Sequence, residues 1–459
     1  MSNGLPRGWA KASVSEIVEH MQPGFACGEK NVEGGVPHLR MNNIGIEGRL
    51  VLNLVRTVPE KLSKSHHDLC PGDVLVCTTN SSKLVGKCAL FNLPGRYVFS
   101  NHLTRLRPKL DLVDSYFLLW SLWLRWQAGT FEDKCKHWVN QSTLPKEGLL
   151  ETDVALAPIN EQHRIVAKLE KLLGKVDGCQ QRLTKIPVIL KRFRQSVLAA
   201  ACSGRLTADW RQEKGIELEG WTEALLRDVA EMRLGKMLDN AKNIGNPTRY
   251  LRNLNVRWFS FDLSNVGTMR ATSEERNELE IKDGDLLVCE GGEPGRCGVW
   301  NFGVSDLIFQ KAIHRIRVKE MVNSYWLAFN IRNDANSAHL EDYFTGTTIK
   351  HLTGKALATY RFPLPSVSEQ SEIVRRVEAL FGLADQIEAR FTKARARVNQ
   401  LTQAILAKAF RGELVFQNPN DEPASVLLER IKAERMKGET EGKGGGKKRL
   451  NVNRKSKGR

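Results

Sequence analysis

Ile159-Asn160-Glu161-Gln162-His163-Arg164-Ile165-Val166 opens a pattern that returns 208 residues later as Val367-Ser368-Glu369-Gln370-Ser371-Glu372-Ile373-Val374. After each opening, apolar residues recur at alternating steps of four and three for ten positions, from Ile165 to Val197 and from Ile373 to Ile405. This spacing averages 3.5 residues and is typical of the contact seam of a coiled coil. The sequence therefore predicts two long helices that are copies of one another.

The ends of the two helices also match. Asn160 and Ser368 suit the N-cap position, because a short side-chain oxygen can accept from an unpaired amide of the first turn. Gly204 and Gly412 suit the left-handed residue that ends a helix. A helix of about 40 residues would be roughly 60 Å long.

The regions before the helices are duplicated as well. Gly72-Asp73-Val74-Leu75-Val76-Cys77 has a counterpart 212 residues later in Gly284-Asp285-Leu286-Leu287-Val288-Cys289. Within each copy, short apolar runs bounded by Gly, Pro and Asn predict strands at 73–78, 102–107, 285–290 and 312–318. Aromatic-rich runs predict helices near 116–126 and 325–331. The chain is thus one unit, a globule followed by a long helix, written twice.

The predicted fold is therefore a multidomain α/β (α+β) protein. Two mixed α/β globules are separated by two long antiparallel coiled-coil helices with pseudo-two-fold symmetry, because equivalent surfaces meet about such an axis only when the helices run in opposite directions. The expected segments are a first globule at 1–157, a central helical spacer at 158–212, a second globule at 213–365, a distal helical spacer at 366–416 and a C-terminal segment at 417–459.

The charge of the chain points to a polyanionic partner. The formal net charge is +17, and Lys443–Arg459 holds eight basic and no acidic residues, which predicts a disordered basic tail. Subtracting these eight charges from +17 leaves +9 for the folded part, which favours nucleic acid. A tail that only aids solubility or contacts phosphate indiscriminately is an open alternative.

The compartment is expected to be the cytoplasm. The sequence shows no leader that combines a basic, an apolar and a small-residue region, and no run of 18 apolar residues, so we expect neither export nor a membrane span. Nine scattered cysteines without a C-x-x-C pair indicate reduced thiols.

Motifs of nucleic-acid enzymes were sought and not found. The phosphate-binding pattern G-x-x-x-x-G-K-[ST] is missing, and Asn246-Pro247-Thr248-Arg249-Tyr250 does not fit the loop of an adenine methyltransferase. Asp262 with Glu280 and Lys282 could be drawn as a nuclease site, but such carboxylates are usually solvated. His66-His67-Asp68-Leu69-Cys70 could offer zinc ligands, but the more economical interpretation is a turn before the strand at Val74. We therefore expect no catalytic and no metal-binding residues.

At this point the chain resembles a specificity (S) subunit of a type I restriction-modification enzyme, over nearly its full length. The resemblance depends on the two Glu-Gln-x-x-Ile-Val openings, on Leu190–Leu198 with Gly204-Arg205-Leu206-Thr207, and on Leu401–Leu414. The closing run Leu428–Arg435 with its basic tail is most similar to the enterobacterial A-type branch.

The resemblance implies a non-catalytic subunit with two target-recognition domains, each reading one half of a split, asymmetric site in double-stranded DNA. It also implies two modification (methyltransferase) subunits and two restriction (translocase) subunits as partners. S-adenosylmethionine, ATP and Mg²⁺ would bind to those partners, and no cofactor to this chain. The family's helices act as a ruler for the gap between half-sites and as the dock for modification subunits.

Candidate DNA-contacting residues were chosen by chemistry, since Arg pairs with guanine, Asn or Gln with adenine, and Lys mostly with phosphate. In the first globule they are Arg40, Asn42, Asn43, Ser81, Ser82, Lys83, Lys87, Lys134, Lys136, His137, Asn140, Gln141 and Ser142. In the second globule they are Arg252, Asn253, Asn255, Arg257, Arg296, Lys311, Thr347, Thr348, Lys350 and His351. About half are expected to touch DNA, and a plain surface role is the alternative for each.

Two other classes of function stay open from the residues alone. One is a DNA-modifying enzyme that acts by itself, and the other is a coiled-coil interaction protein that does not bind DNA. Methylation of a split site by a complex that contains the chain would separate these classes from a DNA-reading subunit.

Overall fold

The computed structural model describes residues 4–29, 31–139, 141–217, 220–239, 241–303 and 305–433 of the 459-residue chain. The predicted basic tail and Asn140 lie outside this range. The chain divides into two compact units, which comprise residues 1–181 with 395–459 (unit 1) and residues 182–394 (unit 2). Each unit thus holds one globule together with part of each long helix.

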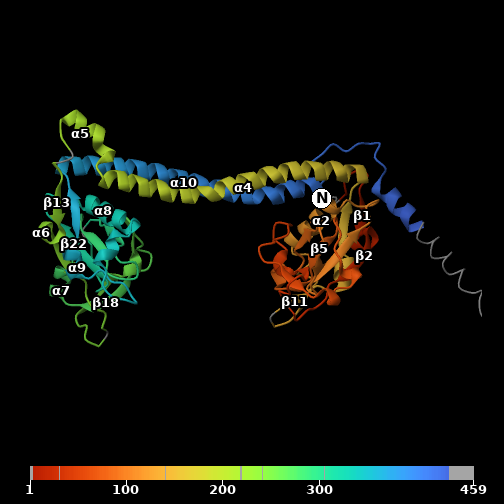
Figure 1. Ribbon diagram of the computed structural model, residues 1–459, viewed down its shortest axis with the longest axis horizontal. Coiled ribbons are helices and arrows are strands. Elements are labelled where there is room, and N and C mark those ends of the chain that lie inside the picture. Colours follow the sequence, from red (N-terminus) through yellow and green to blue (C-terminus); the bar gives the residue numbers. More distant parts are fainter. Residues whose placement is uncertain are drawn as a thin grey trace, which may run out of the picture. The chain divides into compact units, whose positions relative to one another are not determined.

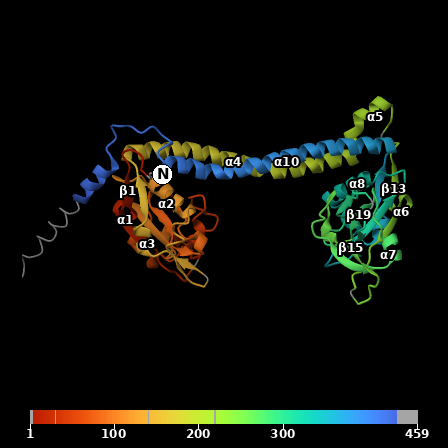
Figure 2. The same ribbon diagram turned by 180° about the vertical axis from the view of Figure 1, so that it is seen from behind.

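The two long helices are α4 (Ile159–Cys202) and α10 (Val367–Phe410), each of 44 residues, so the predicted duplicated helices are confirmed. In unit 1, Leu169 near the start of α4 shares a core with Leu406 near the end of α10. In unit 2, Leu198 near the end of α4 shares a core with Ile373 near the start of α10. The helices therefore run antiparallel in both units, and they lie side by side in the ribbon views (Figures 1 and 2).

The helix starts correct one prediction. Helices α4 and α10 begin at Ile159 and Val367, so Asn160 and Ser368 lie inside the first turn and are not N-caps. The hydroxyl of Ser366 accepts from the amide of Glu369 at 3.3 Å instead. At the other end, Gly204 and Gly412 have φ angles of 75° and 72°, which confirms the predicted left-handed residues.

The first globule is built around a four-stranded sheet of order β2-β9-β5-β7 and a three-stranded sheet of order β4-β3-β8. The first sheet consists of β2 (Val18–Pro23), β9 (Leu103–Pro108), β5 (Val74–Cys77) and β7 (Cys88–Leu90). The second consists of β4 (Arg56–Val58), β3 (Val36–Leu39) and β8 (Val98–Phe99). The remaining pair is β1 (Ala10–Ser13) with β12 (Asp153–Leu156).

The second globule repeats this topology. Its sheets have the orders β14-β22-β19-β20 and β18-β15-β21, and β13 pairs with β23. The strands are β14 (Ala230–Leu234), β22 (Ile313–Val318), β19 (Leu286–Cys289), β20 (Cys297–Val299), β18 (Gly267–Ala271), β15 (Asn246–Leu251), β21 (Ile308–Phe309), β13 (Thr222–Leu225) and β23 (Arg361–Leu364). The duplication read from the sequence is therefore a duplication of fold.

Each globule adds one small sheet of its own. In the first, β10 (Lys136–His137), β11 (Ser142–Thr143) and β6 (Thr79–Asn80) form a three-stranded sheet. In the second, β16 (Val256–Arg257) pairs with β17 (Ser260–Phe261). The short helices are α1 (Val14–Ile17), α3 (Lys146–Leu150), α5 (Ala208–Lys214), α6 (Leu226–Val229), α7 (Ser273–Glu278) and α9 (Gly354–Ala358).

An aromatic helix joins each globule to the long helices. These are α2 (Ser115–Gln127) and α8 (Ser324–Asn336), as predicted. The ring of Phe117 in α2 lies 4.8 Å from that of Phe410 in α10, and the ring of Phe329 in α8 lies 6.4 Å from that of Phe381. Within the described residues, no helix is both long and apolar enough to cross a membrane.

The C-terminal segment belongs to the core of unit 1. Residues 424–433 are helical, and Ala424, Leu427 and Leu428 are buried against the first globule. The amide of Ala424 donates to the carbonyl of Gly8 at 2.8 Å. Both ends of the described chain are thus held in one core.

A buried glutamine at the start of each long helix holds the loop before the aromatic helix. Gln162 Oε1 accepts from the amide of Asp114 at 2.9 Å, and Nε2 donates to the carbonyls of Leu112 and Ala157. Gln370 makes the same three kinds of bond, to the amide of Asn323 and the carbonyls of Met321 and Pro365. Because Asp114 and Asn323 are the N-caps of α2 and α8, each glutamine couples a long helix to its globule.

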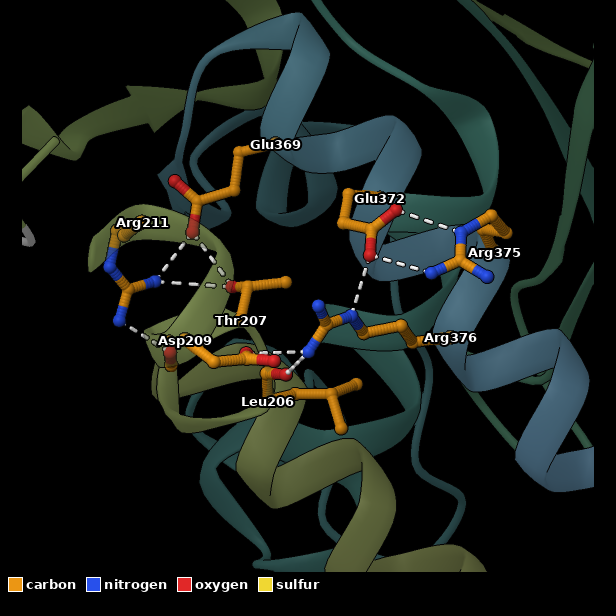
Figure 3. A network of polar contacts seen from close by, with 9 residues as sticks. Leu206, Thr207, Asp209, Arg211, Glu369, Glu372, Arg375 and Arg376 are labelled. Carbon is orange, nitrogen blue, oxygen red and sulfur yellow. Dashed lines mark hydrogen bonds and ion pairs between the residues drawn. The ribbon is translucent and has the colours of Figure 1, made fainter. Parts of the chain in front are cut away.

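The adjacent glutamates have unlike surroundings. Glu369 accepts a hydrogen bond from Thr207 and forms an ion pair with Arg211, whose side chain is 8% exposed (Figure 3). It also accepts a hydrogen bond from Trp221. Beside it, Arg376 of α10 bonds to Glu372, Asp209 and the carbonyl of Leu206. This network ties the turn after α4 to the start of α10 within unit 2.

In unit 1, Glu161 is equally buried, but among the described residues it forms no ion pair. Burial raises its pKa, while the side chains of Trp9 and Gln417 and the charge of Arg164 oppose this effect in part. The same glutamate position is therefore electrostatically satisfied in unit 2 and strained in unit 1.

Replacing each glutamate by glutamine should thus affect the two units differently at pH 7. Glu369→Gln leaves the buried Arg211 without its carboxylate and should lower the free energy of unfolding of unit 2 by about 3 kcal/mol. Glu161→Gln removes a buried carboxyl group that has no ion-pair partner among the described residues, so unit 1 should be unchanged or more stable. Urea unfolding followed by hydrogen exchange of peptides from each unit measures both effects.

The pH dependence provides the control. A folded-state pKa above the unfolded value means that the stability supplied by protonated Glu161 is lost as pH rises from about 4.5 through the folded pKa. Glu161→Gln should flatten this dependence in unit 1. Equal losses of stability in both variants, or an unchanged pH profile, would contradict the assignment.

Candidate nucleic-acid interface

Polar residues of the first globule gather where two parallel strands end. Strands β3 and β8 pair in parallel, with Leu39 opposite Phe99, so the residues that follow them come together. Arg40 and Asn42 line a cavity of about 330 Å³ here, together with residues from β4 and from the turn between β8 and β9. Two of the predicted DNA-contacting residues thus share one site.

A second group forms around the small sheet of the first globule. Strand β6 pairs with β11, with Asn80 opposite Ser142, and so brings the loop that holds Ser81, Ser82 and Lys83 to the β10–β11 hairpin. Lys136, His137 and Gln141 are exposed on this hairpin, beside the exposed Trp138. Two loops about 60 residues apart in sequence therefore form one polar edge.

Other predicted residues of the first globule serve the fold. Asn43 is fully buried, accepts from the amide of Arg40 and donates to the carbonyls of Val51 and Leu54. Lys87 is buried and donates to the carbonyl of Ile44, and Lys134 donates to the carbonyl of Gly148 and to Thr152. Ser142 is buried and bonds to His137. We leave these four, Asn43, Lys87, Lys134 and Ser142, out of the proposed contact set.

In the second globule, a glycine-containing loop brings predicted residues together. A Cβ atom on Gly291 would lie 3.2 Å from the ring of His351, and one on Gly292 would lie 3.1 Å from the side-chain nitrogen Nδ2 of Asn253. The glycines therefore allow Asn253 and His351 to approach the loop that follows β19. Thr347, Thr348 and Lys350 are exposed on the turn that ends at His351.

The remaining predicted residues of the second globule fall into two groups, those that are hydrogen-bonded within the fold and those that are exposed. Asn255 is fully buried and repeats the bonds of Asn43, so it too serves the fold. Arg252 donates to the carbonyl of Asn265, and Arg296 donates to that of Asn253 and pairs with Glu293. Arg257, which lies 3.6 Å from Asp262, and Lys311 are exposed.

Side chains of the two alternative sites considered from the sequence make local contacts. His67 is buried against the ring of Phe25, and Asp68 accepts from Arg96. Asp262 accepts from Ser264, while Lys282 pairs with Glu280 at 3.0 Å. Among the residues that the structure describes, no group of three His, Cys, Asp or Glu side chains is arranged to hold a metal ion.

Sequence reasoning missed six polar residues that line the cavity beside Arg40, namely Glu29, His38, Arg56, Ser100, Asn101 and His102. Ser100-Asn101-His102 is a polar run directly after the apolar Val98-Phe99, which is a usable signal. The missing information was the parallel pairing of β3 with β8, which joins residues about 60 positions apart.

Comparisons with known proteins agree on one family. A family model described as "Type I restriction modification DNA specificity domain" matches residues 218–394. The chain is 32% identical to the EcoKI specificity subunit of a type I restriction enzyme from Escherichia coli (strain K12), over 95% of this chain and 97% of that protein. It is 31% identical to the StySPI specificity subunit from Salmonella potsdam, over 94% and 96%. These matches confirm the predicted resemblance and its enterobacterial branch.

Solved structures show the same fold. The HsdS subunit from Thermoanaerobacter tengcongensis superposes with a TM-score of 0.60 at 18% identity, over 90% of this chain and 99% of that one. A chain from a structure titled for complex assembly and conformational transition of the type I R-M system gives a TM-score of 0.67 at 18% identity, over 89% and 99%.

The two globules differ in one pair of side chains beside these loops. In the second, His314 Nε2 lies 3.0 Å from Glu290 Oε2, whereas the first has Thr78 and Thr104 in hydroxyl contact at 3.1 Å at the equivalent positions. Burial lowers the pKa of His314, although Glu290 opposes this. The second globule thus has an acid-labile pair, Glu290 with His314, at the start of the loop that follows β19.

Exchanging both residues for threonine should remove this sensitivity. Because the pKa of His314 is lower in the folded than in the unfolded chain, the unfolded chain binds more protons near this pKa. The free energy of unfolding therefore declines as pH falls below about 6.5, by at most about 1.4 kcal/mol per pH unit. The Glu290→Thr/His314→Thr variant should show a shallower decline between pH 7.5 and 5.5. Urea unfolding monitored by hydrogen exchange of the β22 peptide measures it, and equal slopes in both proteins would contradict the prediction.

Proposed function

Because this chain belongs to the specificity subunits of type I restriction-modification enzymes, we propose that it reads a split, asymmetric site in double-stranded DNA, one half-site per globule. Such subunits recognise DNA and do not catalyse its modification or cleavage. One observation carries the proposal of asymmetry. The two globules share strand order and register but differ in the loops and small sheets that carry the polar residues. A common scaffold with unlike loops suits two unlike half-sites.

The proposed contacts follow from exposure and chemistry. In the first globule they are Arg40, Asn42, Ser81, Ser82, Lys83, Lys136, His137 and Gln141. In the second they are Asn253, Arg257, Lys311, Thr347, Thr348, Lys350 and His351, with Arg252 and Arg296 as supports of the loop. The net charge of +17 supports binding to a polyanion.

We further propose that two modification subunits dock on the long helices and that two restriction subunits complete the complex. Apolar side chains exposed on the helices of unit 2 support a dock, and they are Val188, Ile189, Leu383 and Ile387, between 39% and 56% exposed. S-adenosylmethionine, ATP and Mg²⁺ would then bind to the partner subunits. The nine cysteines are free thiols, which supports a cytoplasmic location.

Co-expression tests the proposal directly. The chain should co-purify with a modification subunit, and the complex should methylate adenines in a split site that the modification subunit alone leaves unmarked. Methylated adenines are mapped by sequencing the host genome. Methylation without a split site, or DNA modification by the chain alone, would contradict the proposal.

The helices should also set the gap between the half-sites. Four residues added after Lys175 in α4 and four after Leu401 in α10 lengthen both helices by roughly 6 Å, which equals about one or two base pairs. Methylation mapping should show a longer gap and unchanged half-sites. Lys175→Ala is the control of unchanged length, and an unaltered gap in the insertion variant would count against this role.

A further inference from the structure

The cavity beside Arg40 in the first globule is lined by donors that the protein itself leaves unused. We call it the Arg40 pocket, and its polar lining consists of Glu29, His38, Arg40, Asn42, Arg56, Ser100, Asn101 and His102. Within the described residues, Arg40 Nε and Ser100 Oγ have no hydrogen-bond partner, whereas His38 interacts with the backbone carbonyls of Phe25 and Phe99. Ser100 is only 4% exposed. Buried polar atoms are rarely left unpaired, so these groups point to a ligand.

The two arginines of the pocket are also without a carboxylate partner, although Glu29 lines the same cavity. Among the described residues, neither Arg40 nor Arg56 forms an ion pair with a carboxylate. Burial lowers the pKa of Arg40, and the neighbouring charge of Arg56, which lines the same cavity, acts in the same direction. A bound group with negative charge or several acceptor atoms would stabilise the two charged guanidinium groups.

The second globule closes the same place. His38 stands opposite Arg56 in the β3–β4 pair, and the equivalent partners in the β15–β18 pair are Tyr250 and Gly267. A Cβ atom on Gly267 would lie 2.3 Å from the Tyr250 ring, so this ring fills the space that is open in the first globule.

The charge of the second site is also neutralised. Lys236 takes the position of Phe25, since each donates its amide to the residue at the end of the paired strand, Phe309 or Phe99. The ammonium group of Lys236 forms an ion pair with Glu275. One copy of the fold thus keeps an open cationic pocket where the other has a tyrosine and an internal ion pair.

We propose that the Arg40 pocket binds an acceptor-rich group of the DNA, a guanine edge or a backbone phosphate, at the first half-site. The second globule reads its half-site without an equivalent pocket. This inference rests on the proposed function, because the ligand is the DNA that the chain is proposed to read. Arginine suits both groups, since its planar fork matches the O6 and N7 atoms of guanine and the oxygens of phosphate.

The test removes or fills the pocket in the complex with a modification subunit. Arg56→Ala removes one guanidinium group, and His38→Tyr with Arg56→Gly copies the closed arrangement of the second globule. Arg96→Ala is the matched control, because Arg96 lies in the same globule and is engaged by Glu60 and Asp68. Methylated adenines are mapped for each complex, and binding to a 40-base-pair fluorescein-labelled duplex with the mapped site is measured by anisotropy at 50 to 200 mM salt.

Both pocket variants should weaken binding about 10- to 100-fold, while Arg96→Ala and the second half-site remain unaffected. A guanine contact would relax the choice of base at one position of the first half-site. A phosphate contact would weaken all sequences alike and reduce the salt slope by about one. Arg56→Lys separates the two further, since lysine restores a phosphate contact better than a bidentate one.

Unchanged affinity and an unchanged first half-site in both pocket variants would overturn the inference and leave the proposed function standing. A wild-type complex that marks no split site would overturn both. Circular dichroism and intact recognition of the second half-site show whether the variants are folded. If the double variant is not folded, Arg56→Ala decides, because Arg56 lies on an edge strand.

Discussion

The buried glutamine at the start of each long helix is the interaction on which the rest depends. Gln162 and Gln370 each bind one amide and one carbonyl of the loop before the aromatic helix, and one carbonyl of the segment before their own long helix. Replacing either by an apolar residue would leave these backbone groups buried without partners, at about 1–3 kcal/mol each. A globule can therefore be positioned on its helix by a contact that does not involve its recognition loops.

That separation explains how one scaffold can carry two unlike surfaces. The scaffold contacts recur in both copies, as the paired arrangements of Asp73 with Arg107 and Asp285 with Arg317 show. The differences concentrate beside the loops, where Thr78 and Thr104 are replaced by Glu290 and His314. The fold is thus held constant while the surface that meets DNA is free to vary.

Much of the fold could be predicted from the sequence, because duplication doubles every signal. The seam periodicity and the terminal glycines gave both long helices, and the apolar runs gave β5, β9, β19 and β22 to within about a residue. The predicted N-caps Asn160 and Ser368 were wrong. Residue preference alone does not distinguish Ser368 from Ser366, whose hydroxyl accepts from the amide of Glu369.

The interface was harder to predict, because polarity does not reveal pairing. Asn43 and Asn255 carry the side chain that reads adenine, yet both are spent on the backbone of the turn after a strand. Arg56 gave no sequence signal, and neither Arg56 nor His102 could be placed beside Arg40 without knowing the pairing of β3 with β4 and β8. Long-range strand order is what a single sequence does not contain.

The central claim is that each globule reads its own half-site from an equivalent scaffold. The most direct test is a chain in which the second globule, residues 213–365, also replaces residues 1–157, co-expressed with the modification subunit. Mapping of methylated adenines should then reveal a symmetric site made of two inverted copies of one half-site. Persistence of the original asymmetric site would contradict the account.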